Sequence, residues 1–201
     1  MTTATAIDWN AWREGYEDMS FEDMQAFYEE VAERHPVQQS FAADSAETAF
    51  DLIGGKGRLH VVELGGWNGR LAAHMLERGG IGHWRNFDIV DVPQVCTHPD
   101  YSRVVLEDWF WKGPWRVGDV FVATHTIEHL SAEHLAALLR TVHTHWIYLE
   151  SPLAWEPTDW TNYPGSHKLE VGWQGVEEMI VREIGYERVA ATDLAGLWRR
   201  K

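Results

Sequence analysis

The chain has 201 residues, 45% of them hydrophobic, which suits a single domain with a substantial core. It carries 17 basic and 31 acidic residues, a formal net charge of -14, so a nucleic-acid partner is disfavoured. Cys96 is the only cysteine, which excludes an intrachain disulfide and favours a reducing compartment. The N-terminus lacks the apolar stretch of a signal peptide, and no run of about 18 apolar residues occurs, so we expect a cytoplasmic protein without a membrane partner.

Two or three helices are predicted before any strand, and two of them can be placed. The first begins at Ser20, which with Asp23 resembles a capping box, and Pro36 limits it. The second is predicted over 45–54, where two glycines end it. We interpret residues 1–53 as an N-terminal helical cap.

From residue 56 onward, strands and helices alternate along the chain. The strands are predicted at 58–64, 83–90, 102–108, 118–125, 145–152, 186–193 and 196–200. The helices between them are predicted at 69–80, 131–143 and 173–185. This alternation predicts an α/β fold with a mainly parallel sheet, so 56–201 forms the core of one domain that spans 1–201.

The glycine-rich segment "ELGGWNG" lies between the first strand and its helix, a place where loops present backbone N–H groups to a ligand. A phosphate-binding P-loop needs a Gly-Lys-Ser/Thr ending, which is absent here. A dinucleotide fingerprint needs glycine where the chain has Trp67 and Arg70. An acid-led pattern, E-x-G-x-G-x-G, is met by Glu63, Gly65 and Gly69 and departs only at Trp67.

The segment "VVELGGWNGRLA", residues 61–72, resembles the first motif of the class I S-adenosylmethionine-dependent methyltransferases. The resemblance covers roughly residues 56 to 195. It implies a three-layer Rossmann-like fold with a seven-stranded sheet, S-adenosyl-L-methionine as cofactor, and methyl transfer to an oxygen or nitrogen of a small-molecule acceptor. The loop would cradle the ribose and the amino-acid end of the cofactor, and an acidic lead residue suits its cationic groups. The implied contacts are Glu63, Gly65, Gly66, Trp67, Asn68 and Gly69.

Two further cofactor contacts follow from the same resemblance. An acidic residue at the end of the second strand would bind both ribose hydroxyls, and Asp88 fits better than Asp91 because it lies about 20 residues after Gly65. After the third strand, Asp108 would lie near the adenine amino group, with the ring of Trp109 facing the base.

Histidines supply the catalytic candidates. The segment "FVATHTIEHLS" resembles one that is common in small-molecule methyltransferases and places His125 near the cofactor and the reacting centre. The segment "GSHKLEVGWQGV" resembles the late part of the family and contributes His167. A hydroxyl acceptor must lose its proton, and histidine titrates near neutrality, so His125 and His167 are the predicted catalytic residues.

Other interpretations stay open at this point. His125, Glu128, His129 and His167 resemble the metal site of small-RNA 3′-terminal 2′-O-methyltransferases, although that family has glutamate in place of His125. We predict no metal, because Glu-His pairs also occur in methyltransferases that bind none. An NAD-linked oxidoreductase and a catalytically inactive cofactor-binding protein are the further alternatives. The resemblance implies that the long segment 153–172 builds the acceptor pocket, with aromatic walls from Trp155, Trp160, Tyr163 and Trp173; packing of this loop on the core is the alternative.

Overall fold

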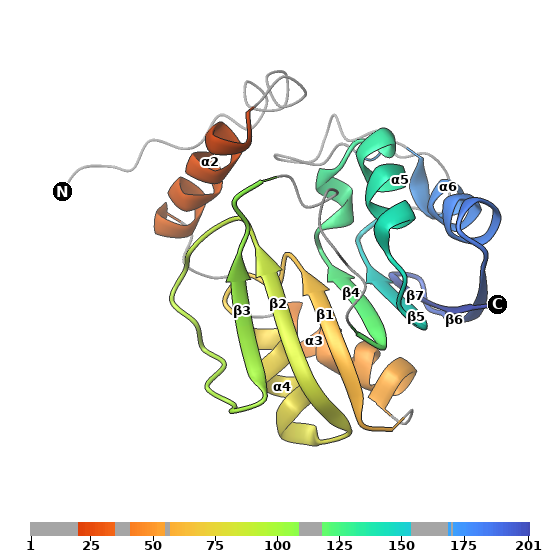
Figure 1. Cartoon of the computed structure of the whole chain (residues 1–201), viewed down its shortest axis with the longest axis horizontal. Helices are drawn as coiled ribbons and strands as arrows, with labels where there is room; N and C mark the ends of the chain where they lie inside the picture. The colour runs from red at the N-terminus through yellow and green to blue at the C-terminus, as the bar shows by residue number, and fades with distance from the viewer. Residues whose placement is uncertain (1–19, 35–40, 55–56, 109–117, 154–168, 170) are drawn as a thin grey trace.

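The computed structural model describes residues 20–34, 41–54, 57–108, 118–153, 169 and 171–201. Within them the chain forms a seven-stranded sheet of order β3-β2-β1-β4-β5-β7-β6 (Figure 1). Strands β1 to β5 pair in parallel, and β7 runs antiparallel to both β5 and β6. The predicted α/β fold with a mainly parallel seven-stranded sheet is confirmed. The strands are β1 (Leu59–Leu64), β2 (Ile81–Asp88), β3 (Tyr101–Val105), β4 (Val120–Thr124), β5 (Trp146–Glu150), β6 (Tyr186–Ala191) and β7 (Ala195–Arg200).

The strand order reverses beside β1. After β1 the chain builds β2 and β3 on one side, then crosses to build β4 and β5 on the other. Leu64, at the end of β1, therefore pairs with Phe87 of β2 and with Ala123 of β4. In open α/β sheets, ligands bind outside the carboxyl ends of the strands at such a reversal.

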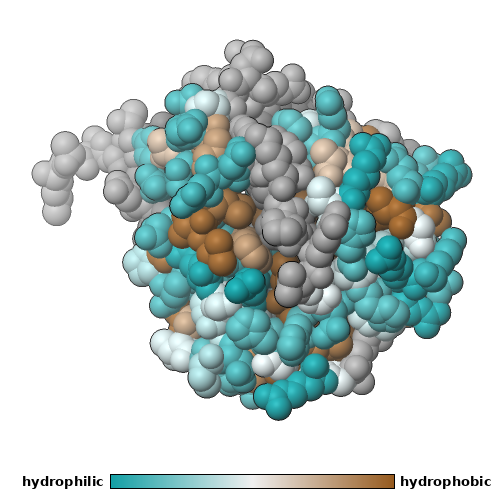
Figure 2. All heavy atoms as spheres, in the orientation of Figure 1, coloured by the Kyte–Doolittle hydropathy of each residue, from teal (hydrophilic) through white to brown (hydrophobic). Residues whose placement is uncertain are grey.

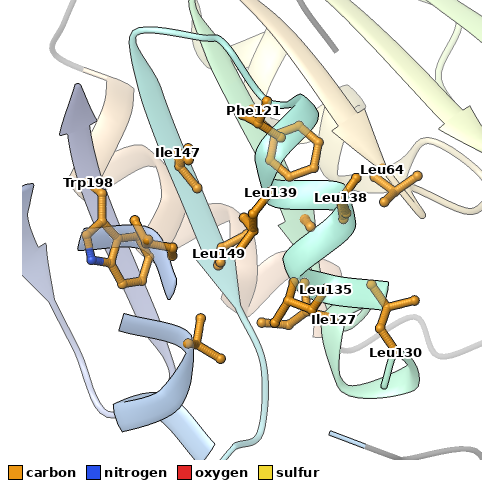
Figure 3. Packing of buried hydrophobic residues seen from close by; sticks show 14 of the residues in the cluster. Leu64, Phe121, Ile127, Leu130, Leu135, Leu138, Leu139, Ile147, Leu149 and Trp198 are labelled. Atoms are coloured by element: carbon orange, nitrogen blue, oxygen red, sulfur yellow. The ribbon is translucent and has the colours of Figure 1, made fainter. Parts of the chain in front are cut away.

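Helices cover both faces of the sheet and complete three layers (Figure 1). One face packs against α5 (Ala132–Thr141) and α6 (Gly172–Glu178), which continues as a π-helical turn over Met179–Glu183. The other face packs against α3 (Phe41–Ala49), its π-helical extension Phe50–Gly54, and α4 (Arg70–Arg78). Figure 3 shows leucines of α5 packed over β4 and β5.

The helix α2 (Phe21–Arg34) lies beyond the carboxyl ends of β2 and β3 (Figure 1). Its predicted cap is present, because Ser20 Oγ accepts from the Asp23 amide at 3.1 Å and donates to the Asp23 carboxylate at 2.8 Å. Gln25 Nε2 donates to the Ile89 carbonyl at 2.8 Å, and Met24 packs against Ile89. The helix is thus attached to the segment that follows β2.

Some predicted boundaries are wrong by a few residues. Strand β2 begins at Ile81, two residues earlier than predicted, because Ile81 pairs with Leu59. Strand β3 ends at Val105, so Asp108 lies in an exposed turn beyond it. The helix α3 begins at Phe41, four residues earlier than the predicted start at 45. No helix in the described ranges is long and apolar enough to cross a membrane.

Candidate functional site

The loop after β1 turns through three residues with left-handed backbone conformations. Gly65, Trp67 and Gly69 have φ angles of 72°, 49° and 75°. A Cβ at Gly65 would lie 2.3 Å from Thr126 Oγ1, so only glycine fits there. Trp67 has no such freedom, and the left-handed conformation costs a non-glycine residue about 1–2 kcal/mol. The surrounding structure must therefore hold Trp67 in place.

Side chains from β2 and from the segment that follows it hold Trp67 in this conformation. Asn86 Oδ1 accepts from the Gly66 amide at 3.0 Å, and its Nδ2 donates to the Trp67 carbonyl at 3.3 Å. Asp88 Oδ2 accepts from the Trp67 amide at 2.7 Å. Gln94 Nε2 also donates to the Trp67 carbonyl at 3.3 Å. Both polar groups of the Trp67 backbone are thus bonded, which offsets the strain.

Sequence reasoning missed Asn86 and Gln94. Asn86 is fully buried, and its amide also donates to Tyr101 Oη at 3.2 Å. Successive strand residues alternate between faces, so Asn86 shares the face of Asp88. The signal in the sequence was an amide side chain two residues before the predicted ribose acid, on the same face of the strand.

Four amides of the loop donate to acceptors within the protein, which corrects the expectation that they are free to bind a ligand. The Gly65 amide donates to the Phe87 carbonyl at 2.8 Å, and the Gly69 amide donates to the Gly66 carbonyl at 2.9 Å. The amides of Gly66 and Trp67 are bonded to β2 as described above. A loop whose donors are satisfied internally is a poor cradle for a pyrophosphate.

Glu63 lies beneath this loop. Its side chain is fully buried, and Oε2 accepts from Trp84 Nε1 at 2.7 Å. Among the residues that the structure describes, Oε1 has no hydrogen-bond partner. A Cβ on Gly66 would lie 2.2 Å from Oε2, so the carboxyl group occupies the space directly under Gly66. Burial raises the pKa of Glu63 to about 8, so most of the group is neutral at pH 7.

Asp88 stands at the end of β2, where the ribose acid was expected. Its Oδ1 accepts from the Val90 amide at 3.2 Å, and the side chain is largely buried. Burial raises the pKa of Asp88, while hydrogen bonds from Val90 and Trp67 and the charge of Arg103 oppose the rise. The other candidate, Asp91, is exposed and pairs with Arg103 at 3.2 Å.

The expected adenine contacts lie at the rim of the described structure. Asp108 is exposed beyond β3, and Trp109 lies outside the described residues.

His125 follows β4 with a left-handed backbone, at φ 50°, and donates its amide to the Glu150 carbonyl at 2.9 Å. Its Nδ1 lies 3.7 Å from Glu128 Oε1, and its Nε2 lies 3.6 Å from Glu150 Oε1. Burial alone would lower the pKa of His125, but the two carboxylates outweigh it and raise the pKa. The two carboxylates thus stabilise the protonated form of the ring relative to that of a free imidazole.

The two carboxylates differ in their surroundings. Burial raises the pKa of Glu128 to about 7, although Ser151 Oγ donates to its Oε2 at 2.9 Å. Glu150 is also buried, but hydrogen bonds from His125, Ser45 and Tyr148 hold its pKa below the ordinary value. Ser45 comes from α3, so this cluster was not visible in any local sequence pattern.

The metal site considered as an alternative gains no support from the described residues, which contain no group of three His, Cys, Asp or Glu able to hold an ion. His129 instead meets the ring of Tyr28 from α2 edge-on, with ring centroids 6.1 Å apart. His167 lies outside the described residues.

A cavity of about 410 Å³ opens between α6 and the β6–β7 hairpin. Trp173 and Trp198 line it, stacked with centroids 6.1 Å apart. Of the expected aromatic walls, Trp173 is thus placed on the α6 side of the sheet. Trp155, Trp160 and Tyr163 lie outside the described residues.

Comparison with known proteins finds similarity in structure alone. No protein-family model matches the chain, and no curated protein matches it. Among solved structures, human N-acetylserotonin methyltransferase in complex with SAM shares 16% identity at a TM-score of 0.59. The pyocyanin biosynthetic protein PhzM shares 12% at 0.62. Magnesium protoporphyrin IX methyltransferase from Synechocystis PCC 6803 with bound SAH shares 12% at 0.53.

The matches differ in extent. The first two cover 97% of this chain, which spans 60% and 62% of their own lengths. The third covers 81% of this chain and 83% of its own. At such identities the likeness concerns the fold. The chain has the fold of the class I S-adenosylmethionine-dependent methyltransferases.

Proposed function

We propose that the protein transfers a methyl group from S-adenosyl-L-methionine to an oxygen or nitrogen of a small-molecule acceptor. The carrying observation is the loop Gly65–Gly69 at the reversal of strand order, with four of its amides bonded within the protein and Asp88 beside it. That edge suits a nucleoside without phosphates. The structural neighbours named as methyltransferases, two of them with SAM or SAH bound, support the same cofactor.

The residues present fit this cofactor. Asp88 uses one acceptor site on each oxygen for the amides of Trp67 and Val90, and a carboxylate has about four such sites, so capacity remains for two ribose hydroxyls. Asp108 and Trp109 remain the proposed adenine contacts. Glu63 supports the loop and does not contact the cofactor in this proposal, because its buried carboxyl group fills the space under Gly66.

The cofactor supplies an electrophilic methyl on a sulfonium. The protein then has to align the acceptor with that methyl and exclude water, and orientation of this kind is worth about 7–11 kcal/mol at most. The helix α2 covers the carboxyl edge near Ile89 and His129 and serves this exclusion. His125 receives the proton of the acceptor, and the carboxylates of Glu128 and Glu150 stabilise the resulting imidazolium. We propose His167 as a second candidate base.

The small-molecule acceptor is supported by the net charge of -14, which opposes an anionic polymer. The segment 153–172 remains the proposed source of the acceptor pocket.

The proposed cofactor can be tested directly by calorimetry and thermal shift. We expect S-adenosylmethionine and S-adenosylhomocysteine to bind and stabilise the protein, and NAD to do neither, because the amides of Gly65, Gly66, Trp67 and Gly69 are already bonded and do not serve a pyrophosphate. Release of S-adenosylhomocysteine with a panel of hydroxyl and amine acceptors then separates an enzyme from an inactive binding protein. Binding of NAD in preference to both nucleosides would refute the proposal.

A pair of glycine variants tests the crowding of the loop against Thr126. Gly65→Ala and Gly57→Ala both place a side chain at positive φ, but only the former brings a Cβ within 2.3 Å of another side-chain atom, since Gly57 faces open space. We expect Gly65→Ala to lose S-adenosylhomocysteine affinity and Gly57→Ala to keep it, as measured by calorimetry. Equal affinities in the two variants would contradict the role given to this contact.

The buried carboxyl of Glu63 predicts a pH dependence of stability. Its pKa is raised from 4.5 to about 8 on folding, so its contribution is full below 4.5 and is lost as pH rises toward 8. Glu63→Gln removes this titration while keeping the shape of the group. In urea titrations, the free energy of unfolding should fall less between about pH 5 and pH 8 for the variant than for the wild type. Parallel pH profiles would show that Glu63 is ionised in the folded protein.

The base assignment is tested by His125→Ala, His167→Ala and the double variant. Loss of the proton acceptor should reduce release of S-adenosylhomocysteine by about 10²–10⁴-fold in the variant that lacks the base. Cofactor affinity, measured by calorimetry, should change little. Full turnover in the double variant would rule out both histidines.

A further inference from the structure

The cavity between α6 and the β6–β7 hairpin has the size of a small-molecule site. Its volume is about 410 Å³. Cavities that bind small molecules commonly enclose about 300–1,000 Å³, so a ligand of one or two rings fits. Three of its lining residues, Ala191, Ala195 and Gly196, are small. A Cβ on Gly196 would lie 2.2 Å from the ring of Trp198, so the hairpin packs directly against that ring.

Hydrogen bonds fix the walls of this cavity in place. Arg188 of β6 donates to Glu177 of α6 at 2.7 Å and thereby joins the two elements that bound the cavity. Within the hairpin, Thr192 Oγ1 accepts from the Ala195 amide at 3.0 Å, and the Thr192 amide donates to the Ala195 carbonyl at 2.8 Å. Walls that are already bonded need little rearrangement to receive a ligand, which lowers the cost of binding.

The walls combine indole rings with an excess of negative charge. Trp173 and Trp198 form one aromatic wall, with 29° between their rings, and indole rings favour planar groups and cations. Among the residues that the structure describes, the charged ones in the lining are Glu177, Arg188 and Asp193. Because Arg188 pairs with Glu177, Asp193 is the carboxylate at hand for a cationic ligand. The net charge of -14 on the chain also favours a cation.

The cavity is separate from the loop Gly65–Gly69. That loop follows β1, whereas Gly196 and Trp198 belong to β7. The sheet order β1-β4-β5-β7 puts three strand spacings between the two, which amounts to about 14 Å at about 4.8 Å per spacing. A ligand in the cavity and a nucleoside at the loop can therefore be bound at the same time.

We propose that this cavity binds a planar aromatic amine in its protonated form. The aromatic ring packs against Trp173 and Trp198, and the ammonium group lies beside Asp193. The proposal holds whether or not the protein transfers methyl groups, because it rests on this cavity alone.

Calorimetry with three matched probes tests the class of ligand. 2-Naphthylmethylamine combines a planar ring with an ammonium group. 2-Naphthoate keeps the ring but carries a carboxylate, and the decahydro analogue of the amine keeps the charge on a saturated, non-planar ring. We expect the aromatic amine to bind about tenfold more tightly than either control, because only this probe satisfies both the indole rings and the carboxylate. Saturating S-adenosylhomocysteine should leave its affinity unchanged.

A matched pair of variants tests the location. Ala191→Phe fills the cavity and should abolish binding of 2-naphthylmethylamine. Val189→Phe adds a ring to an exposed position of the same strand, outside the lining, and should preserve binding. Asp193→Asn removes the proposed counter-ion and should weaken the amine about tenfold while 2-naphthoate does not lose affinity.

Four results would overturn the proposal. Absence of binding to the wild type would show that the cavity does not accept this class of ligand. Equal affinities for wild type and Ala191→Phe would show that the amine binds elsewhere. Tighter binding of 2-naphthoate would show that the charge preference is wrong. Competition with S-adenosylhomocysteine would show that the amine occupies the cofactor site.

Discussion

The conformation of one residue, Trp67, governs the candidate site. Its left-handed backbone is stable because Asp88 accepts from its amide while Asn86 and Gln94 donate to its carbonyl. These bonds occupy the inner side of the loop and fix the path of the chain into α4. The same side chains thereby disfavour phosphate-bearing ligands at the loop, because amides that are already hydrogen-bonded do not bind phosphate.

Much of the fold was predictable because it depends on local pattern. Alternating strands and helices gave the α/β class, and Ser20 gave the start of α2. Gly65 and Asp88 were implied by the resemblance to a known motif, and both lie at the reversal of strand order. What could not be predicted rests on contacts between distant segments, such as Ser45 of α3 with Glu150. The burial of Glu63 follows from the loop folding back over β1, which no local pattern records.

Burial and interactions with neighbouring side chains set the ionisation of the acidic residues at the carboxyl edge of the sheet. Burial raises the pKa of Glu63 to about 8 and that of Glu128 to about 7, while neighbouring carboxylates raise the pKa of His125. Hydrogen bonds from His125 and from the hydroxyls of Ser45 and Tyr148 hold the pKa of Glu150 below its ordinary value. A chain with a large acidic excess thus presents only a few ionised carboxylates at the place where a cationic sulfonium would bind. Each charge that remains at this edge therefore lies beside a defined partner.

The attachment of α2 sets how ligands reach this edge. In the described structure the helix meets the rest of the protein through Gln25 on the Ile89 carbonyl, Met24 against Ile89, and Tyr28 against His129. Ile89 also packs against the core on the α5 side of the sheet, so α2 is joined to that core through it. Ile89 directly follows Asp88, the proposed ribose acid, in the chain. A displacement of α2 would therefore act on the candidate site through the segment that follows β2.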